Sequence, residues 1–429
     1  MSTTNRPAVT DVPVVKEKMS RRHVLVIVTG IMITFGCSAL VFSTWGLFQP
    51  VVSDALGIPT TRFALYITIL YLTMTACSPF AGKILQTADV RIVLTIAACL
   101  VSAGFCVMSF AHAIWVFYVA GVLLGIGEIF ILWLAVPTLI NNWFAERAGF
   151  FIGICMAFTG VGGAVWAAVF TALNSGGTDF HTIYRIWAVI ALVTSVPFTL
   201  FCVRRRPEDV GLVAYGARTA RGAVVEPARG VSVSSVMRSP IFYSLCLFAC
   251  VINIVNLISM QFPTYTKQLT DVGFDVVVVG GVMTTVMMVG QALGKIVLGT
   301  VADRTSRGAL IFAFIAGSFG VLLCWLGFRT SLVLYSGAFV FGFFYATAVV
   351  LVPVMTRDLF GRREYPLIYS RVSTAFNLVG AFASMIWAWI GSSYGFSTLF
   401  LVGLAMIVVV FVLGLVSLQG TKRLRDQWT

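Results

Sequence analysis

Two ionisable side chains stand deep inside long apolar stretches of this 429-residue chain. Lys295 lies in the apolar stretch 276–301, and Glu128 is the one acid of sixteen placed at the middle of such a stretch, 114–141. A charge inside a bilayer is costly unless it has a partner, so ionisable residues at this depth are candidates for a functional site. For Lys295 the alternatives are a structural ion pair or a side chain that snorkels to the membrane edge.

Glu128 admits three interpretations. Burial among apolar neighbours favours the protonated carboxyl, which makes this residue a candidate proton carrier. It could instead pair with Lys295 until a ligand takes its place, or it could be a structural acid bonded to a hydroxyl. Both functional interpretations require Glu128 to face a cavity.

Other polar side chains recur at helical spacing and mark faces that we expect to line a cavity. Residues four apart lie on one face of a helix. These side chains are Trp45 and Gln49, Tyr71 and Thr75, Asn253, Asn256 and Met260, Gln291 with Lys295, and Tyr345. For each of them the alternative is a hydrogen bond that holds two helices together.

The elements that position these residues are apolar helices. The chain is 59% hydrophobic and only 10% charged, whereas soluble domains carry about 25% charged residues. A membrane-spanning helix needs about 20 mainly apolar residues. The runs of this kind are 24–51, 62–86, 92–111, 114–141, 148–173, 183–203, 240–266, 276–301, 309–328, 331–356, 367–391 and 397–418. The sequence therefore predicts an all-α membrane protein with twelve transmembrane helices.

A polar, arginine-rich segment, 204–239, divides these helices into six and six. We expect an N-terminal tail (1–23), two six-helix halves (24–203 and 240–418) and a C-terminal tail (419–429). All but five of the 29 basic residues then fall on or beside one face of the membrane, the five being Arg62, Arg185, Lys267, Lys295 and Arg329. The excess of Lys and Arg on the cytoplasmic side of membrane proteins predicts that both termini are cytoplasmic. The net charge of +13 is thus topogenic, and we expect no nucleic-acid partner.

The two halves resemble each other in sequence. Residues 137–144 read PTLINNWF and residues 353–360 read PVMTRDLF, with the same spacing from proline to phenylalanine. A second pair is GKILQTADVR from Gly82 and GKIVLGTVADR from Gly294. Repeated halves place the site of a transporter near the middle of the membrane, at their interface.

A loop signature of glycine, acid and bases follows the eighth predicted helix, at Gly299, Asp303, Arg304 and Arg307. With this signature and its six-plus-six helices, the chain resembles the major facilitator superfamily. This resemblance implies a cytoplasmic gate in which an acid–base pair must break on opening; ordinary loop charge is the alternative. The first-half copy keeps Gly82 and Arg91, but Gln86 stands where the acid is expected.

Three further stretches resemble the oxalate/formate antiporter and monocarboxylate porter branch: residues 141–153, the glycine-rich fifth helix and residues 204–212. This resemblance implies that Lys295 is the fixed counter-charge for an organic anion. Where some members of the branch carry a second basic residue, this chain has Asn377, before Gly380, and we expect Asn377 in the substrate-binding site. A single central cation favours a monoanionic substrate.

We therefore expect a secondary transporter in the bacterial inner membrane for a small organic anion, a monocarboxylate being favoured, by proton symport or anion exchange. The alternatives are efflux of drug-like or aromatic compounds and, from another class, a non-transporting sensor, for which the tails leave no room for an output domain. No nucleotide-binding or catalytic motif is present, so we expect no enzyme. We also expect no cofactor, no metal, contacts with membrane lipids, and a monomer.

Overall fold

The computed structural model describes residues 14–16, 18–220, 229–269, 276–327 and 329–420. The first half contains six spans, of which two are interrupted by π-helical segments. Their bounds are α1 (Arg21–Ile33), η1 (Thr34–Ser38) and α2 (Ala39–Leu56) for the first; α3 (Thr60–Thr87); α4 (Val90–Met108); α5 (Ile114–Glu128), η2 (Ile129–Ala135) and α6 (Val136–Trp143) for the fourth; α7 (Ala148–Ser175); and α8 (Phe180–Phe201).

The second half also contains six spans, and its first and fourth spans are again interrupted. Its elements are α10 (Pro240–Asn256), the 3₁₀ segment η4 (Leu257–Gln261) and α11 (Phe262–Lys267) for the seventh span; α12 (Val276–Arg304); α13 (Ser306–Leu326); α14 (Ser331–Tyr345) and α15 (Thr347–Phe360) for the tenth; and α16 (Tyr365–Gln419).

Helix α16 comprises two spans. Its 55 residues would measure about 80 Å at 1.5 Å per residue, far more than the ~30 Å of a hydrocarbon core. At Gly395 the backbone adopts φ 82° and ψ 164°, which breaks the helix. This φ favours glycine because it has no Cβ. The described residues thus form twelve spans, and the predicted all-α fold with two six-helix halves is confirmed.

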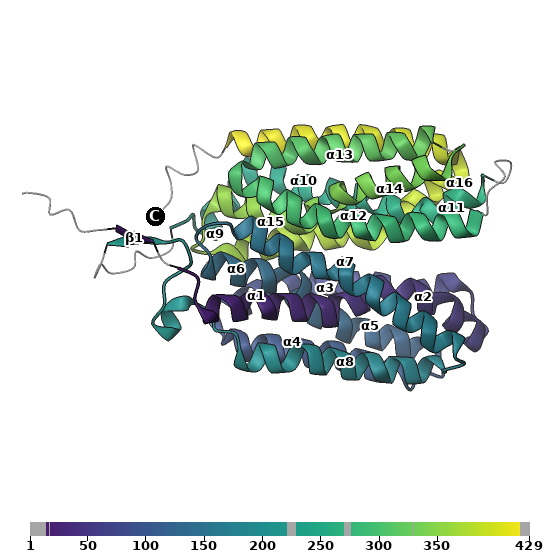
Figure 1. Cartoon of the computed structure of the whole chain (residues 1–429), viewed down its shortest axis with the longest axis horizontal. Helices are drawn as coiled ribbons and strands as arrows, with labels where there is room; N and C mark the ends of the chain where they lie inside the picture. Colours follow the sequence, from purple (N-terminus) through teal and green to yellow (C-terminus); the bar gives the residue numbers. More distant parts are fainter. Residues whose placement is uncertain (1–13, 17, 221–228, 270–275, 328, 421–429) are drawn as a thin grey trace, which may run out of the picture.

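Short elements lie at one end of the bundle. They are β1 (Val14–Lys16) and β2 (Arg218–Ala220), which pair antiparallel with Val15 opposite Thr219, together with η3 (Pro207–Val210) and α9 (Val233–Val236). The sequence did not predict this small sheet. Helix α1 begins and helix α16 ends at this same end, on the left in Figure 1. We call it the basic end, because it also carries the described residues of the arginine-rich segment 204–239, which are 204–220 and 229–239. The predicted tails, 1–23 and 419–429, lie largely outside the described residues.

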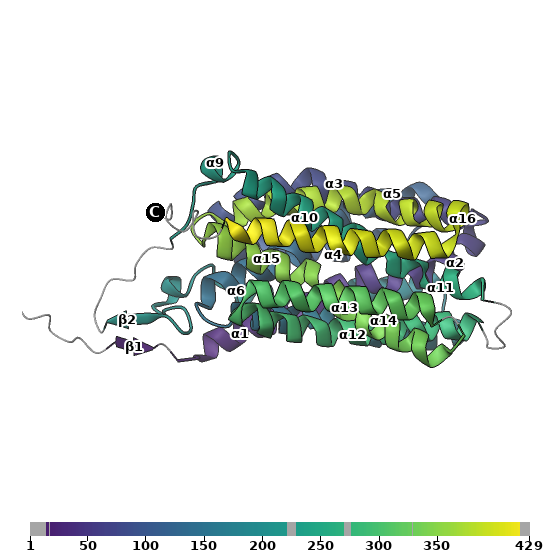
Figure 2. The same cartoon turned by 90° about the horizontal axis from the view of Figure 1, so that it is seen from above.

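The two halves lie side by side along the length of the bundle in Figure 1, and in Figure 2 the second half lies in front of the first. They meet where α7 packs on α12 and where α3 packs on α16. Glycines allow the close approach: a Cβ on Gly149 would lie 2.7 Å from the carbonyl oxygen of Gly299, and a Cβ on Gly153 would overlap the carbonyl of Lys295. The backbone that carries Lys295 is therefore held directly against the other half.

Candidate functional site

A cavity of about 630 Å³ lies between the two halves. The first half contributes residues of η1, α2, α3, η2 and α7. The second half contributes residues of α10, η4, α11, α12 and the tenth and eleventh spans. Eight of the nine side chains that the sequence placed in a binding site line it: Trp45, Gln49, Tyr71, Asn253, Asn256, Gln291, Lys295 and Tyr345. Of the two other side chains predicted on cavity faces, Met260 lines it and Thr75 does not.

The ninth residue, Asn377, does not line this cavity. Its neighbour Phe376 does, and one residue along a helix turns the side chain by about 100°. Asn377 is fully buried, and neither atom of its side-chain amide has a hydrogen-bond partner among the described residues. In this conformation Asn377 thus lies outside the cavity wall, and its part in the binding site stays a prediction.

Lys295 reaches the cavity from α12 with a side chain held by neutral groups. Its Nζ donates to Thr159 Oγ1 at 2.6 Å and to Gln291 Oε1 at 2.9 Å. Within the described ranges, no carboxylate lies at ion-pair distance from it, and the residue is only 2% exposed. The structure therefore shows neither the ion pair nor the snorkelling side chain. Since a lysine ammonium has three N–H donors, one remains for a ligand.

Glu128 lies beside the cavity rather than in its wall. The carboxyl is fully buried and accepts a hydrogen bond from Ser38 Oγ at 2.8 Å, and Ser38 lines the cavity. The other oxygen, Oε1, has no hydrogen-bond partner among the described residues. Of the three interpretations, the bond to a hydroxyl is present, and the ion pair with Lys295 is absent in this conformation. Both functional interpretations require Glu128 to face a cavity, and here it reaches the cavity only through Ser38.

The contact between Glu128 and Ser38 forms where two helices lose regular α geometry. The π-helical segment η1 ends at Ser38, and η2 begins directly after Glu128. π-Helical turns are rare and frequently mark functional sites. They bring the first and fourth spans together beside the cavity.

Several wall residues were missed by the sequence reasoning. The indole of Trp133, in η2, lies 4.4 Å from the ring of Phe376, measured between centroids, and this contact joins the two halves. Phe42 and Tyr71 form a second aromatic pair at 5.9 Å. Buried aromatics fill any helix bundle, so no sequence signal marked them. Thr159 did have a signal, because it is a polar residue directly before the glycine run of the fifth helix.

The amides in the cavity wall also hold helices together. Asn253 Nδ2 donates to the carbonyl of Phe376 at 2.8 Å, and Asn256 Nδ2 donates to the carbonyl of Tyr345 at 3.2 Å. The second carbonyl is freed by the break between α14 and α15 at Ala346. These two residues therefore both line the cavity and form the hydrogen bonds between helices that were the alternative interpretation.

The predicted gate residues lie at the basic end. Asp303 accepts hydrogen bonds from the backbone N–H groups of Gly149 and Phe150, each at 2.7 Å, at the N-terminus of α7. An anion there is stabilised by the orphan N–H groups and the helix dipole. Arg304 and Arg307 are exposed and form no ion pair with it within the described residues. The acid of the gate is therefore paired with a helix terminus of the other half, not with its neighbouring arginine.

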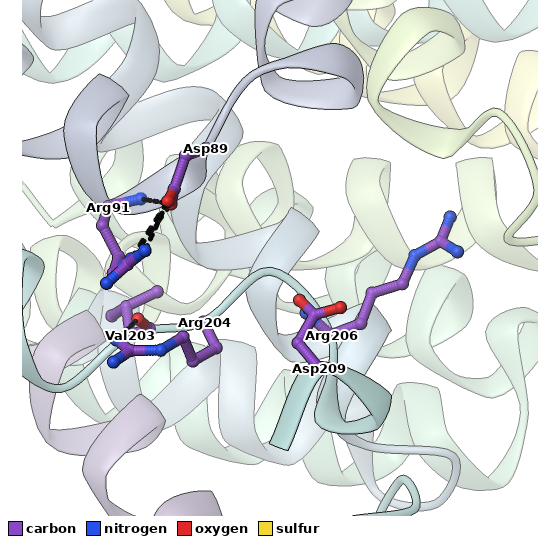
Figure 3. A network of polar contacts seen from close by, with 6 residues as sticks. All are labelled: Asp89, Arg91, Val203, Arg204, Arg206 and Asp209. Atoms are coloured by element: carbon purple, nitrogen blue, oxygen red, sulfur yellow. Dashed lines mark hydrogen bonds and ion pairs between the residues drawn. The ribbon is translucent and has the colours of Figure 1, made fainter. Parts of the chain in front are cut away.

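The first-half gate residue, Arg91, has a local partner. Its Nη2 lies 2.6 Å from Asp89 Oδ2, and Asp89 also accepts from the backbone N–H of Arg91 (Figure 3). These bonds hold the pKa of Asp89 below its ordinary value, so the carboxylate is ionised at neutral pH. Asp89 thus supplies the acid missing at Gln86, but it does not bridge the halves.

A second set of bonds closes the basic end. Arg357 donates to Asn141 Oδ1 at 3.2 Å and to the carbonyl of Ala145 at 2.9 Å, and Arg362 donates to the carbonyl of Asn142 at 3.3 Å. Asn141 and Arg357 each stand four residues after the repeated proline, so equivalent positions of the two halves meet. The halves are joined on the basic side of the cavity in this conformation.

The family model of the Major Facilitator Superfamily matches residues 30–283 and 269–427, which is nearly the whole chain. The chain belongs to the Major Facilitator Superfamily. It is a multi-pass membrane protein with the fold of a transporter. A curated relative, the glucose-6-phosphate exchanger SLC37A2 of Xenopus laevis, is 26% identical over 240 residues. That match covers 46% of this chain and 45% of the exchanger, so it spans less than half of either protein.

Three solved structures share the fold. They are the human organic anion transporter MFSD10 (TM-score 0.67, 14% identity, covering 92% of this chain and 99% of that one), a bacterial homologue of the iron transporter ferroportin in an outward-facing state (0.68, 12%, 93% and 100%), and the proton:xylose symporter XylE (0.67, 13%, 91% and 93%). At these identities the likeness extends to the fold alone.

Proposed function

We propose that this transporter carries a small organic anion, a monocarboxylate being favoured, by alternating access. The observation that supports this is Lys295, a buried ammonium in the cavity between the halves whose protein partners are two neutral oxygens. A cation buried without a counter-ion is unfavourable, and a carboxylate ligand removes that cost. With a single cation in the wall, a monoanion balances the charge of the site and a dianion exceeds it.

The partners of Lys295 link binding to the interface. Lys295 and Gln291 belong to α12, whereas Thr159 belongs to α7 of the other half. A carboxylate that bonds the ammonium therefore acts on a contact made by both halves. Trp45, Tyr71 and Tyr345 surround the remainder of the cavity and suit the organic part of the substrate.

Alternating access requires the contacts at the basic end to form and break. We assign the basic end to the cytoplasmic side of a bacterial inner membrane. The bonds from Gly149 and Phe150 to Asp303 hold that end closed. Opening it requires these bonds to break, after which the halves part along α7 and α12. The oxalate/formate and monocarboxylate branch remains our proposal for the subfamily.

Glu128 is the proposed site of proton coupling. Glu128 is fully buried, and its Oε1 accepts no hydrogen bond from the described residues. Such a carboxyl is more stable protonated than charged. Ser38 connects it to the cavity wall, because its hydroxyl bonds Glu128 and also lines the cavity. Proton symport then requires Glu128 to lose its proton when the other conformation hydrates it. Anion exchange does not require this step.

Efflux of an aromatic or drug-like compound is the second candidate. It is favoured by the aromatic wall formed by Trp45, Phe42, Tyr71, Trp133 and Phe376. The two candidates differ in what Lys295 recognises, since a neutral aromatic compound has no need of the ammonium.

A thermal-stability screen of the purified protein separates them. Each carboxylate is tested beside its neutral amide or methyl ester, so that shape is kept and charge is removed. We expect stabilisation by the acids alone, and its loss in Lys295→Gln. Lys83→Gln is the matched control, because Lys83 follows glycine in the repeat-related sequence of α3 but is exposed. Equal stabilisation by acids and amides, unchanged in Lys295→Gln, would refute the organic-anion proposal.

A further inference from the structure

A second and larger cleft, of about 1010 Å³, lies at the basic end between the halves. It is bounded by the connection from α6 to α7, by the connection from α12 to α13, and by the ends of α15 and α16. Its charged wall residues are Glu146, Arg147, Asp303, Arg304, Arg307, Arg357 and Asp358. The transport cycle proposed above uses only Asp303 and Arg357 of this set.

The acids of the cleft are engaged elsewhere. Both oxygens of Asp303 accept backbone N–H bonds from α7. Asp358 accepts a hydrogen bond from the hydroxyl of Ser306. Glu146 packs against Gly216 of the central segment, where an added Cβ would lie 2.8 Å from the Cβ of Glu146. The cleft wall carries four arginines and three acids, so its formal charge is 4 − 3 = +1. Among the described residues, no ion pair joins these acids to Arg147, Arg304 or Arg307.

Three arginines of the cleft have free guanidinium groups. Within the described part of the chain, Arg147, Arg304 and Arg307 form no hydrogen bond or ion pair through their side chains, and all three are exposed. They come from both halves: Arg147 precedes α7, whereas Arg304 and Arg307 flank the turn between α12 and α13. Like charges gathered around one cleft repel each other, and an anion placed between them removes that repulsion.

The backbone at Arg147 is also unusual. Arg147 has φ 56°, and it is the one non-glycine residue with positive φ among those described. It stands at the N-cap of α7, two residues before the Gly149 N–H that binds Asp303. Side chains strain the backbone in this region, and such strained residues cluster at ligand clamps and switches. The conformation thus singles out Arg147 independently of its charge.

We infer that this cleft binds a phosphate group and that the bound phosphate holds the basic end closed. Guanidinium groups match phosphate oxygens with paired N–H donors. A phosphate held by Arg147 on one side and by Arg304 and Arg307 on the other bridges the halves beside the Asp303 contact. It therefore binds the closed conformation more tightly than the open one, and only such a difference shifts the population. The phosphate comes either from an anionic lipid headgroup or from a soluble phosphate.

The test uses the full-length protein and needs no knowledge of the transported solute. Thermal unfolding is measured in detergent with increasing sodium phosphate and with sodium chloride at matched ionic strength. A ligand of the folded state raises the unfolding temperature in a saturable way. We expect this rise with phosphate and not with chloride, and at least a tenfold weaker phosphate affinity in Arg147→Gln and in the double variant Arg304→Gln/Arg307→Gln.

Two controls fix the place of binding. Arg238→Gln removes an exposed arginine of the basic end outside the cleft and should leave the phosphate response unchanged. Lys295→Gln should leave it unchanged as well, since the phosphate is not bound in the central cavity. If the response survives in the cleft variants, or disappears in Lys295→Gln, the inference is wrong, whatever the fate of the organic-anion proposal.

Nanodiscs distinguish the two sources of phosphate. If a lipid headgroup is the ligand, phosphatidylglycerol discs stabilise the wild type more than phosphatidylcholine discs, and the difference vanishes in Arg147→Gln. If a soluble phosphate is the ligand, the two lipids act alike and sodium phosphate still stabilises the protein. No stabilisation by either source would overturn the inference.

Discussion

The proposed roles of Lys295 and Glu128 depend on single polar atoms of their side chains. Lys295 has a third N–H to offer because Thr159 and Gln291 occupy two of its donors. Glu128 has an oxygen without a partner because Ser38 reaches only one of the two. Both side chains are buried, so each would gain from a specific ligand, an anion for the ammonium and a proton for the carboxyl.

Glu128→Gln tests the coupling role at this scale. The glutamine amide keeps the bond from Ser38 and the shape of the protonated acid, but it cannot release a proton. We expect proton-driven accumulation of the carboxylate to fall at least tenfold, while exchange of labelled for unlabelled carboxylate at equal pH continues. The measurement is uptake into proteoliposomes with and without an imposed pH gradient.

Ser38→Ala is the companion variant. Loss of the hydroxyl leaves Oε2 of Glu128 without its hydrogen-bond donor, at a cost of about 0.5–1.5 kcal/mol for one hydrogen bond. A smaller loss of coupling than in Glu128→Gln is expected. If both variants accumulate the carboxylate as the wild type does, Glu128 is a structural acid.

Helix packing determines how the two halves close. α7 and α12 meet through Gly149, Gly153 and Gly299, so that backbone touches backbone. Asp303 then reaches the N-terminus of α7. A side chain at any of these glycines would separate the two helices and lengthen the bonds to Asp303.

Gly299→Ala and Gly281→Ala form a matched pair on α12. A Cβ at Gly299 overlaps the carbonyl of Gly149, whereas a Cβ at Gly281 meets nothing within 4 Å. Overpacking costs about 1–3 kcal/mol, and a compatible Gly→Ala change in a helix adds about 0.4–1 kcal/mol of stability. Thermal unfolding in detergent should therefore show a lower midpoint for Gly299→Ala and an equal or higher one for Gly281→Ala.

Asp303→Asn tests the closure itself. In asparagine an NH2 donor replaces one of the two oxygens that accept from Gly149 and Phe150, so one of these bonds is lost. The substitution also removes the charge that favours the N-terminus of α7. The protein should open more often at the basic end. A cysteine at Thr138, which is 2% exposed in the closed conformation, then reacts several-fold faster with a polar maleimide, in a background without native cysteines. An unchanged rate would show that Asp303 does not hold the gate.

The sequence predicts the helices well because their signal is local. The apolar runs, including the separation of 367–391 from 397–418, depend only on nearby residues. The spacing of Gln291 and Lys295 by four residues likewise places both on one face of a helix. The partner of Asp303 could not be predicted in this way, since it depends on how Gly149 packs against Gly299 across the halves. The position of Asn377 could not be predicted for a related reason. A shift of one residue along a helix turns the side chain by about 100°, so Phe376 lines the cavity and Asn377 does not.

The two ends of the molecule differ in charge and in closure. The described arginines of the segment 204–239 and of both gate loops gather at the basic end, where the halves are also joined. At the other end of the bundle, the cavity wall extends to Gln49 and Pro263, near the ends of α2 and α11. We therefore expect this conformation to admit a solute from the end opposite the basic one.

Cysteine labelling tests this orientation. Ser234 lies at the basic end and Ala55 near the opposite end, and both are exposed. A membrane-impermeant maleimide added to intact spheroplasts should label Ala55→Cys and spare Ser234→Cys, and inside-out vesicles should give the reverse. The same pattern reversed would place the basic end outside the cell.

The most direct test of the central claim is carboxylate uptake by the protein in proteoliposomes, with the substrate chosen by the stability screen. One charge-assisted hydrogen bond contributes about 1.5–3 kcal/mol, a factor of roughly 10 to 150 in affinity. Lys295→Gln should lose uptake by about that factor at low substrate concentration, while Lys83→Gln keeps it. Full uptake by Lys295→Gln would contradict the account.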